Sequence, residues 1–463
     1  MRNRDAMNWN KLREEVLRDI KPTPEEENKL FCFAQKTVDN INKVLAETGI
    51  NAKAEIHGSV AHGTWIKGQQ DLDIFIVNEE YKSRDQLQQA LDALKEGTEW
   101  TYTAAYAEHP YLKTQINGYS IDLVPCFRVE EGELYSSTDR TPLHTKWLSD
   151  RLNGLGDDVR LLKRFLITLG VYGAEIKIGG FSGYLCELLI IYYRGFCNLM
   201  EAAAHWNNKE IFSFTGETRE FDDPLTFIDP VDLRRNVASA LREENYSLFI
   251  AAARSFVKNP SELFFKRAEI DVTPSMVLDM LEDRPTSVLF LVIEEGEADV
   301  PDVLWGQIHK SRQAVEHQLE HNGFKVLRSG AWSNEETRHI FIYELETAKI
   351  PEAFKHMGPP ANLENNVRQF IDAHKNNPRT IAGPDLLQDR WYVLVKREYT
   401  DVKKLMDDLL ANGGRNIGVS KKISVRILQH HRVLLDSEIG DYLKEDFDVY
   451  LFDWLKGRPQ WIE

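Results

Sequence analysis

Long hydrophobic runs are missing from this sequence. A helix that crosses a bilayer needs about 20 consecutive apolar residues, and no stretch comes close to that length. The segment from Met1 to Lys21 is charged throughout, whereas a signal peptide has an uninterrupted apolar core. We therefore expect no membrane segment and no signal peptide. No internal repeat or low-complexity segment stands out either.

Cysteine is scarce. The four cysteines, Cys32, Cys126, Cys186 and Cys197, have neither the spacing of a zinc site nor that of a redox motif. They fit buried thiols in a reducing compartment, so we expect a cytoplasmic protein.

Positive charge is in deficit. Lys and Arg number 57 against 73 Asp and Glu, which gives a formal net charge of −16. This balance argues against a general nucleic-acid binder but leaves room for a local basic face. The 463 residues are 42% hydrophobic and 28% charged, as in ordinary globular proteins, and the length predicts roughly two to four domains.

The segment from Gly58 to Asp73 is the most informative one that is present. Its small residues follow the alternating segment 52–56, which predicts a strand, a turn and then a helical turn. Gly58 and Ser59 can offer backbone N–H groups to a phosphate at this turn.

Asp71 and Asp73 begin the next predicted strand, which runs to Val77. Strand side chains alternate, so the two carboxylates share a face about 7 Å apart and repel each other unless cations lie between them. A bare Asp-x-Asp is usually a solvated strand face. Preceded by a phosphate turn, it predicts a site for two Mg²⁺ ions.

Asp122 is the candidate for a third carboxylate. Asn117-Gly118 predicts a hairpin turn, and the strand after it places Asp122 opposite in direction to Ile121 and Leu123. A lone Asp after a hairpin is commonly a surface residue. Because this strand is the best partner for the Asp71 strand, and two-metal nucleotidyl transfer needs a carboxylate near the attacking hydroxyl, we assign Asp122 that role.

The rest of the chain predicts a helical region followed by a region of mixed strands and helices. Apolar periodicity predicts helices at 157–169, 183–206 and 246–258, which would form a helical domain. Beyond about residue 270 strands and helices alternate, with a short helix expected to begin at Pro351.

Residues 372–432 reverse the charge balance of the chain. They hold twelve Lys and Arg against seven Asp and Glu, together with His374, His430 and His431. A solvated surface would explain this run. Next to a nucleotidyl-transfer domain, we interpret it as a basic surface for a nucleic-acid acceptor.

Several motifs together resemble the archaeal, class I CCA-adding enzymes of the polymerase β-type nucleotidyltransferase superfamily. The resemblance covers essentially the whole chain and is densest from residue 55 to 240. The motifs are Gly58-Ser59, Gly63 to Gly68, Asp71-x-Asp73, Tyr106 to Tyr111, Asp122 to Cys126, Asp139 to Pro142, Val159 to Lys163, Val171 to Glu175, Gly180 to Leu189, Asp229 to Asp232 with Arg235-Asn236, and His356 to Pro359.

The resemblance implies an α+β multidomain fold with a mixed-sheet nucleotidyltransferase head, a helical neck, and an α+β body and tail. The expected boundaries are 1–148 for the head, 149–265 for the neck, 266–298 with 375–463 for the body, and 299–374 for a tRNA-binding tail. The implied activity is template-independent addition of C, C and A to the 3′ end of tRNA from CTP and ATP. A homodimer is left open, and no membrane partner is implied.

The resemblance also implies roles for individual residues. Asp71, Asp73 and Asp122 would be catalytic and would bind two Mg²⁺ ions. The residues implied to contact ATP or CTP are Ser59, His62, His144, Lys163, Tyr172 and Arg235, with His109 lining the site. Arg235 would select the base together with the tRNA backbone.

Two positions depart from the family pattern, and other functions stay open. Asp71 stands where relatives usually have Glu, and His62 where they commonly have Arg. A neutral His would hold a phosphate less firmly than Arg does. The alternatives are a poly(A) or oligoadenylate polymerase of the same superfamily and a tRNA-binding protein without catalysis. Taken singly, Lys163, Tyr172 and His144 could be a surface lysine, a packing aromatic and a polar cap.

Overall fold

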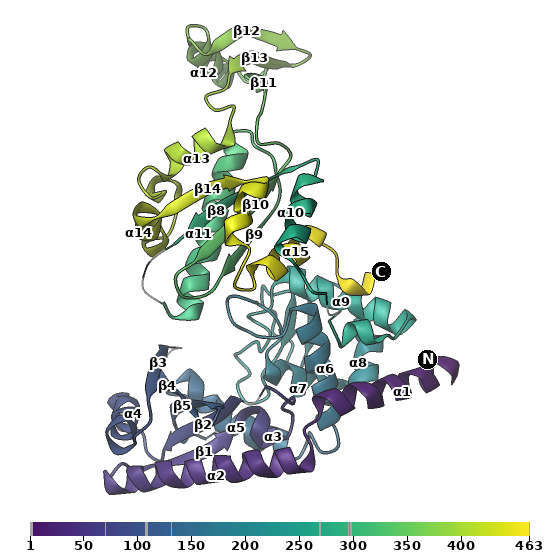
Figure 1. Cartoon of the computed structure of the whole chain (residues 1–463), viewed down its shortest axis with the longest axis vertical. Coiled ribbons are helices and arrows are strands. Elements are labelled where there is room, and N and C mark those ends of the chain that lie inside the picture. The colour runs from purple at the N-terminus through teal and green to yellow at the C-terminus, as the bar shows by residue number, and fades with distance from the viewer. Residues whose placement is uncertain are drawn as a thin grey trace. The chain divides into compact units, whose positions relative to one another are not determined.

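The computed structural model describes residues 3–69, 71–106, 110–130, 132–267, 270–294, 296 and 299–462. Two compact units make up the chain, residues 1–269 with 459–463 and residues 270–458. Both combine helices with sheets, which confirms the α+β expectation (Figure 1). None of the helices in these described ranges has the length and apolar character that a membrane crossing requires.

The first part of unit 1 is a five-stranded mixed sheet in the order β1-β2-β5-β4-β3. In it β2 and β5 are parallel, and the other neighbours are antiparallel. Its elements are α1 (Asn3–Ile20), α2 (Pro24–Glu47), β1 (Ala52–His57), α3 (Gly58–His62), β2 (Asp71–Asn78), α4 (Asp85–Gly97), β3 (Tyr102–Tyr106), β4 (Pro110–Ile116), β5 (Tyr119–Phe127) and α5 (Arg140–Ser149).

Side-chain alternation separates the two faces of this sheet. On β2, Leu72, Ile74 and Ile76 point into a core that α2 and α4 cover, together with Ile121 and Leu123 of β5. The opposite face therefore carries the odd positions of β2 and the even positions of β5. Those positions hold all three predicted catalytic carboxylates, on the side that the helices α2 and α4 leave open.

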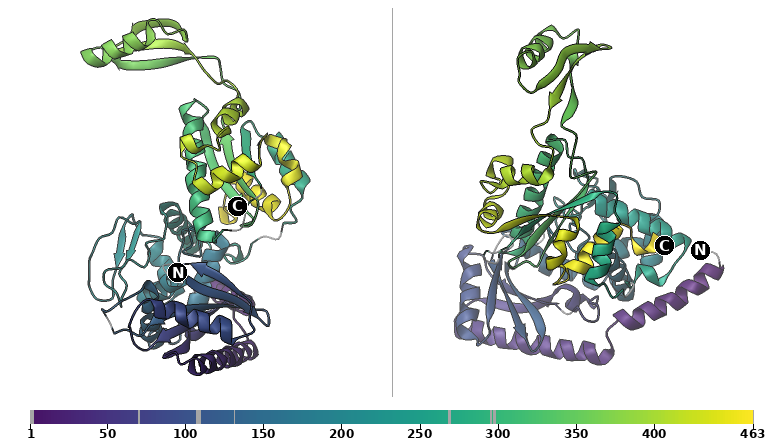
Figure 2. Two further views of the ribbon diagram at one scale, coloured as in Figure 1. Left: turned by 90° about the vertical axis from the view of Figure 1, so that its left-hand side faces the viewer. Right: turned by 45° about the horizontal axis from the view of Figure 1, so that its top comes forward.

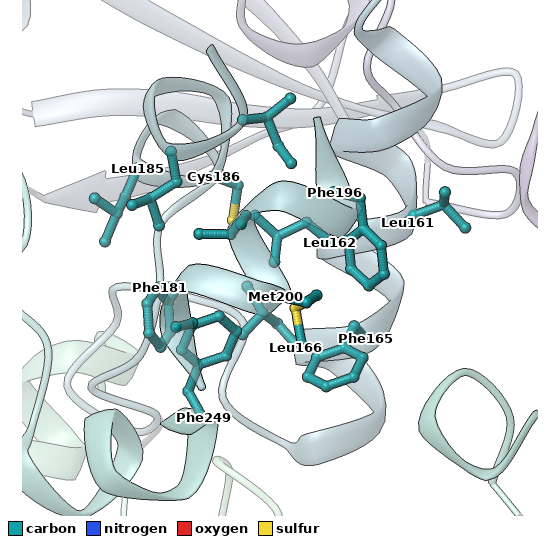
Figure 3. Close-up of a cluster of buried hydrophobic side chains, with 14 of the residues drawn as sticks. Leu161, Leu162, Phe165, Leu166, Phe181, Leu185, Cys186, Phe196, Met200 and Phe249 are labelled. Carbon is teal, nitrogen blue, oxygen red and sulfur yellow. The ribbon is translucent and has the colours of Figure 1, made fainter. Parts of the chain in front are cut away.

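The second part of unit 1 is helical, as the apolar periodicity predicts. It consists of α6 (Gly156–Leu169), α7 (Gly183–Tyr193), α8 (Phe196–Ala203), α9 (Glu243–Lys258) and the strand pair β6 (Glu210–Phe212) and β7 (Leu225–Phe227). Figure 3 shows its core, in which apolar side chains of all four helices interlock. Burying each Phe or Leu contributes roughly 1.5–3 kcal/mol, so this core fixes how the four helices pack.

The prediction of a single helix from 183 to 206 is wrong. Arg194 (φ 58°) and Gly195 (φ 128°) adopt positive φ and divide it into α7 and α8. Continuous apolar character concealed the break, because both halves are buried. Cysteine was also partly misjudged: Cys126 and Cys186 are buried free thiols, but Cys32 is exposed.

Unit 2 contains a four-stranded sheet in the order β14-β8-β10-β9. Strand β8 is buried on both faces, under α11, α13 and α14 on one side and α10 and α15 on the other. The elements are α10 (Pro274–Glu282), β8 (Ser287–Ile293), α11 (Pro301–His321), β9 (Val326–Ser333), β10 (His339–Leu345), α13 (Val402–Leu410), α14 (Lys421–Gln429), β14 (His431–Leu435) and α15 (Phe447–Lys456).

A separate three-stranded sheet, β11-β13-β12, lies within unit 2. It consists of β11 (Ala353–Pro360), β12 (Thr380–Leu387) and β13 (Arg390–Lys396), with α12 (Glu364–His374) against one face (Figure 2). The helix expected to begin at Pro351 is wrong, because residues 353–357 pair with β13 instead.

Residues 301–396 span the expected boundary between tail and body. Residues 301–345, expected in the tail, include the helix α11 and the strands β9 and β10 of the four-stranded sheet, and the small sheet spans 353–396. Strand β10 forms a hairpin with β9, but its pairing with β8 is long-range, so local sequence patterns did not indicate it.

Candidate active site

A cavity of about 430 Å³ opens between the bare face of the head sheet and the helices α5, α6 and α7. Ten of its lining residues come from the segments around β1, β2 and β5, and the others come from β4, α5 to α7 and the loop at Tyr172. They are Gly58, Ser59, His62, Trp65, Ile66, Gln69, Asp71, Asp73, Lys113, Ser120, Asp122, Thr141, His144, Thr145, Lys163, Tyr172, Gly183, Tyr184 and Glu187.

Three carboxylates gather on the head side of the cavity. Parallel pairing of β2 with β5 sets Asp73 directly beside Asp122. Asp71 is two residues before Asp73 on β2 and so lies on the same face. Burial, together with the charges of Asp122 and Asp71, raises the pKa of Asp73 to about 7. Burial also raises the pKa of Asp122. The positive charge near these carboxylates therefore does not offset their burial and mutual repulsion.

Gly58 lets the turn approach these carboxylates. A Cβ at Gly58 would lie 2.1 Å from Oδ2 of Asp73, and its φ of +66° is in the left-handed region. Any larger residue would collide with the carboxylate and strain the backbone. Gly58 is therefore required to avoid a clash with Asp73, in addition to exposing backbone N–H groups at the turn.

Lys113 is a cavity residue that the sequence analysis missed. Its Nζ lies 3.3 Å from Oδ2 of Asp122, directly across the β4–β5 pair. Burial opposes its charge, but Asp122 outweighs that effect, and the pKa of Lys113 is raised. The signal was present: counting back from the two-residue turn at Asn117-Gly118 pairs position 113 with position 122.

The neck contributes two polar side chains to the cavity, Lys163 and Tyr172, and both lie close to Gly183. Nζ of Lys163 donates to the backbone oxygen of Thr64 at 3.1 Å and to its hydroxyl at 3.2 Å. A Cβ at Gly183 would lie 3.1 Å from the hydroxyl of Tyr172 and 3.9 Å from Nζ of Lys163. Gly183 therefore leaves both polar groups open toward the cavity. Burial raises the pKa of Tyr172, which stays a neutral phenol.

His62 is engaged by the protein itself. Its Nδ1 lies 3.1 Å from both carboxylate oxygens of Glu187, and its Nε2 lies 3.2 Å from the hydroxyl of Thr145. Its side chain is only 6% exposed. The geometry therefore gives His62 a part in joining the turn to α7, and its expected contact with the nucleotide stays a prediction.

His144, Asp229 and Arg235 form one hydrogen-bonded unit. Oδ2 of Asp229 lies 3.0 Å from Nε2 of His144 and 2.8 Å from Nη1 of Arg235. Burial would raise the pKa of Asp229, but these partners and the N–H of Val231 lower it to about 2. The pKa of His144 is lowered, chiefly by burial, and its ring stacks on Tyr184 at 3.9 Å.

Most of the predicted site residues thus meet in one place. Eight of them line the cavity: Ser59, His62, Asp71, Asp73, Asp122, His144, Lys163 and Tyr172. Arg235 does not line it but is tied to His144 through Asp229. His109 lies outside the described residues. The sequence analysis did not identify Glu187 and Asp229 as residues that hold other side chains in place, because Glu187 bonds to Thr64 and Asp229 to His144, each more than 80 positions away.

The donor set of the head fits hard divalent cations. Carboxylate oxygens are the ligands that Mg²⁺ prefers, and Mg²⁺ is commonly held by one or two carboxylates with water and substrate phosphates completing its shell. Within the described ranges, no group of three or more His, Cys, Asp or Glu side chains could hold a metal ion by itself. A bound cation would offset the burial and the neighbouring negative charges that raise the pKa of Asp73.

Family models match three consecutive parts of the chain. Residues 157–266 match "tRNA nucleotidyltransferase, second domain", and residues 284–436 match "CCA-adding enzyme, C-terminal domain". Residues 7–149 match "Second Messenger Oligonucleotide or Dinucleotide Synthetase domain". Among solved structures, E. coli CdnC with ATP is similar at 16% identity and a TM-score of 0.45, covering 56% of this chain and 93% of that one.

Curated relatives are similar over nearly their whole length. The CCA-adding enzyme of Pyrobaculum neutrophilum is 36% identical over 86% of this chain and 94% of its own. That of Methanosarcina mazei is 34% identical over 95% of this chain and 97% of its own. That of Saccharolobus shibatae is 37% identical over 79% of this chain and 85% of its own. With its head, neck and C-terminal parts all matched in order, the chain belongs to the family of CCA-adding enzymes.

Proposed function

We propose that this protein adds C, C and A to the 3′ end of tRNA, from CTP and ATP, in the cavity between the head sheet and α5 to α7. Family membership supports the reaction. The observation that carries the location is the side-by-side register of Asp73 and Asp122 on parallel strands, facing Lys163 and Tyr172 of the neck.

In the proposed reaction the 3′-hydroxyl releases its proton to water, its oxygen attacks the α-phosphorus, the bond to the bridging oxygen breaks, and pyrophosphate leaves. Asp71, Asp73 and Asp122 would hold two Mg²⁺ ions, which would lower the pKa of the hydroxyl and neutralise the triphosphate. The turn at Gly58 and Ser59 and the ammonium of Lys163 would orient the phosphates. Positioning and charge stabilisation supply most of the catalysis in such a transfer.

Arg235 is proposed to act in base selection. Cytosine and adenine each carry an exocyclic amine, whereas uracil and guanine carry a carbonyl oxygen at the comparable edge. Arg235 can only donate, so it would bond a ring nitrogen or O2 while a tRNA phosphate accepts from the amine. Its ion pair with buried Asp229 supports this role, because it fixes the guanidinium while leaving its side chain 36% exposed.

The role of Arg235 has a direct test. Arg235→Ala should lower the ratio of CTP to UTP incorporation on tRNA lacking CCA. An unchanged ratio in the folded variant would show that Arg235 is only an ion-pair residue of the neck.

The activity itself is tested with tRNA lacking CCA and each labelled nucleotide. Growth by C, C and A followed by arrest supports the proposal. Unlimited growth with ATP alone would instead identify a poly(A) or oligoadenylate polymerase, and binding without growth would identify a non-catalytic tRNA-binding protein. The three carboxylates on one face of the head sheet, with Asp73 against Gly58, favour the catalytic outcome.

A further inference from the structure

Glu187 is a buried carboxylate that the proposed chemistry does not use. It is 3% exposed and lies on α7 among the buried side chains of Leu185, Cys186, Leu188 and Leu189. Removing a carboxylate from water costs several kcal/mol unless donors surround it. An anion in the wall of a cavity for triphosphates would also repel the substrate. A carboxylate at this position therefore needs an interaction that offsets both its desolvation and its repulsion of the substrate.

The donors that compensate Glu187 all come from the head turn. The hydroxyl of Thr64 donates to its Oε1 at 2.6 Å, and Nδ1 of His62 lies 3.1 Å from each oxygen. Burial raises the pKa of Glu187, but His62, Lys163 and Thr64 outweigh it, so the pKa is lowered and the group stays ionised. His62 and Thr64 flank Gly63, which ends α3 at a φ of +63°. One neck carboxylate thus binds the turn on both sides.

Thr64 extends this connection to Lys163. Its hydroxyl has a single proton, which it donates to Glu187, so it accepts from Nζ of Lys163 at 3.2 Å. The ammonium also donates to the backbone oxygen of Thr64 at 3.1 Å. The side chains of Thr64 and Lys163 are buried, at 0% and 3% exposure. Glu187, Thr64 and Lys163 therefore form a single directed chain of hydrogen bonds.

We propose that Glu187 is a positioning residue for the triphosphate. Acting through Thr64 and His62, it holds the phosphate turn at a fixed distance from Lys163, so that turn and ammonium meet the same phosphate chain. The inference rests on the proposed function. It states that one carboxylate fixes the position of the head turn relative to Lys163 of the neck. Glu187 itself contacts protein donors and is not a catalytic residue.

The test uses an isosteric substitution in the full-length protein. Thr64→Val keeps the volume and removes the hydroxyl, and Thr64→Ser restores it. We expect Thr64→Val and Glu187→Gln each to weaken CTP and ATP binding by about tenfold or more, measured by calorimetry without tRNA. Thr64→Ser should bind within about threefold of the wild type, and tRNA affinity should not change. The KM for both nucleotides should rise more than kcat falls.

A matched control is present in unit 2. Glu344 is also buried and accepts from the hydroxyl of Thr286 at 2.6 Å, but it does not line the cavity. Thr286→Val should lower the melting temperature without changing CTP affinity. If Thr64→Val behaves in the same way, Glu187 has a structural role only and the inference is wrong.

A double substitution and the wild type separate the remaining outcomes. Because Thr64 and Glu187 belong to the same chain of hydrogen bonds, Thr64→Val with Glu187→Gln should weaken CTP binding no more than the stronger single change. Additive losses would contradict the inference, as would wild-type affinity in Glu187→Gln. If the wild-type protein itself fails to bind CTP, the proposed function is overturned, and the inference with it.

Discussion

Two pairs of carboxylates, partly buried on the head side and fully buried on the neck side, lie in or next to the same cavity, and their pKa values shift in opposite directions. On the head side, burial and neighbouring carboxylates raise the pKa of Asp73 to about 7, and the pKa of Asp122 is raised as well. On the neck side, the pKa of Asp229 is lowered to about 2 and that of Glu187 is also lowered, because each is surrounded by donors.

The difference separates two uses of a buried negative charge. The neck carboxylates have their partners within the chain, and they hold other residues in place. The head carboxylates are compensated only in part, by Lys113 at Asp122. Such a cluster is costly for the folded protein alone, and it is stabilised when a cation from outside binds. We therefore propose that the head carboxylates bind cations that arrive with the substrate.

The largest expected effect is on turnover. Asp73→Ala or Asp122→Ala should lower the rate of CMP addition by about a thousandfold or more, because each removes a cation ligand at the reacting phosphate. The affinity for tRNA should change little. Near-normal CMP incorporation by either variant would show that the head carboxylates are not the catalytic ones.

The stability of Asp73→Asn should rise rather than fall. In the unfolded chain Asp73 titrates near 3.8, so between that pH and about 7 the unfolded state loses its proton while the folded state keeps it. The free energy of unfolding therefore decreases as pH rises through this window, and a shift of this size corresponds to roughly 4 kcal/mol. With a chelator at pH 8, Asp73→Asn should be more stable than the wild type, and at pH 4 the two should be similar. Denaturant unfolding at both pH values measures this, and a less stable variant at pH 8 would refute it.

The matching change on the neck should have the opposite sign. Asp229→Asn keeps the shape but leaves Arg235 without its ionic partner, which should cost about 2 kcal/mol of unfolding free energy. The pKa of Asp229 is lowered, so its stabilisation is complete above its unfolded value of 3.8 and is lost as pH falls toward about 2. The deficit of the variant should therefore shrink in acid. A deficit that persists unchanged at the lowest pH where the protein folds would argue against this ion pair.

The smallest expected effects concern the basic stretch. Six of its twelve cations already form ion pairs, namely Lys375, Arg379, Lys396, Lys403, Lys422 and Arg426. If the stretch binds tRNA, replacing Lys404 or Lys421 by Gln should reduce the slope of log affinity against log salt by about one. Lys375→Gln is the control, because its ion pair with Asp372 leaves less charge to offer. If none of the three substitutions changes the slope, the basic stretch is only a solvated surface and does not bind tRNA.

The positions of the three head carboxylates could be predicted from the sequence, whereas the residues that hold other site residues in place could not. Strand alternation and the hairpin at Asn117-Gly118 were enough to bring Asp71, Asp73 and Asp122 to one face, and the same count would have found Lys113. Glu187 and Asp229 could not be found this way, because their roles depend on how α7 and the loop at 229 pack against residues more than 80 positions away.

The most direct test of the contrast between the two carboxylate pairs is proton release on cation binding. At pH 7 a pKa of about 7 leaves Asp73 about half protonated, and ligands must be deprotonated to bind a metal. Calorimetric titration with Mg²⁺, in two buffers of different ionisation enthalpy, should therefore detect release of about half a proton per chain at pH 7 and almost none at pH 9. Asp73→Asn should abolish this release, and Asp229→Asn should preserve it. Cation binding without proton release at pH 7, or the same release from Asp73→Asn, would contradict the account.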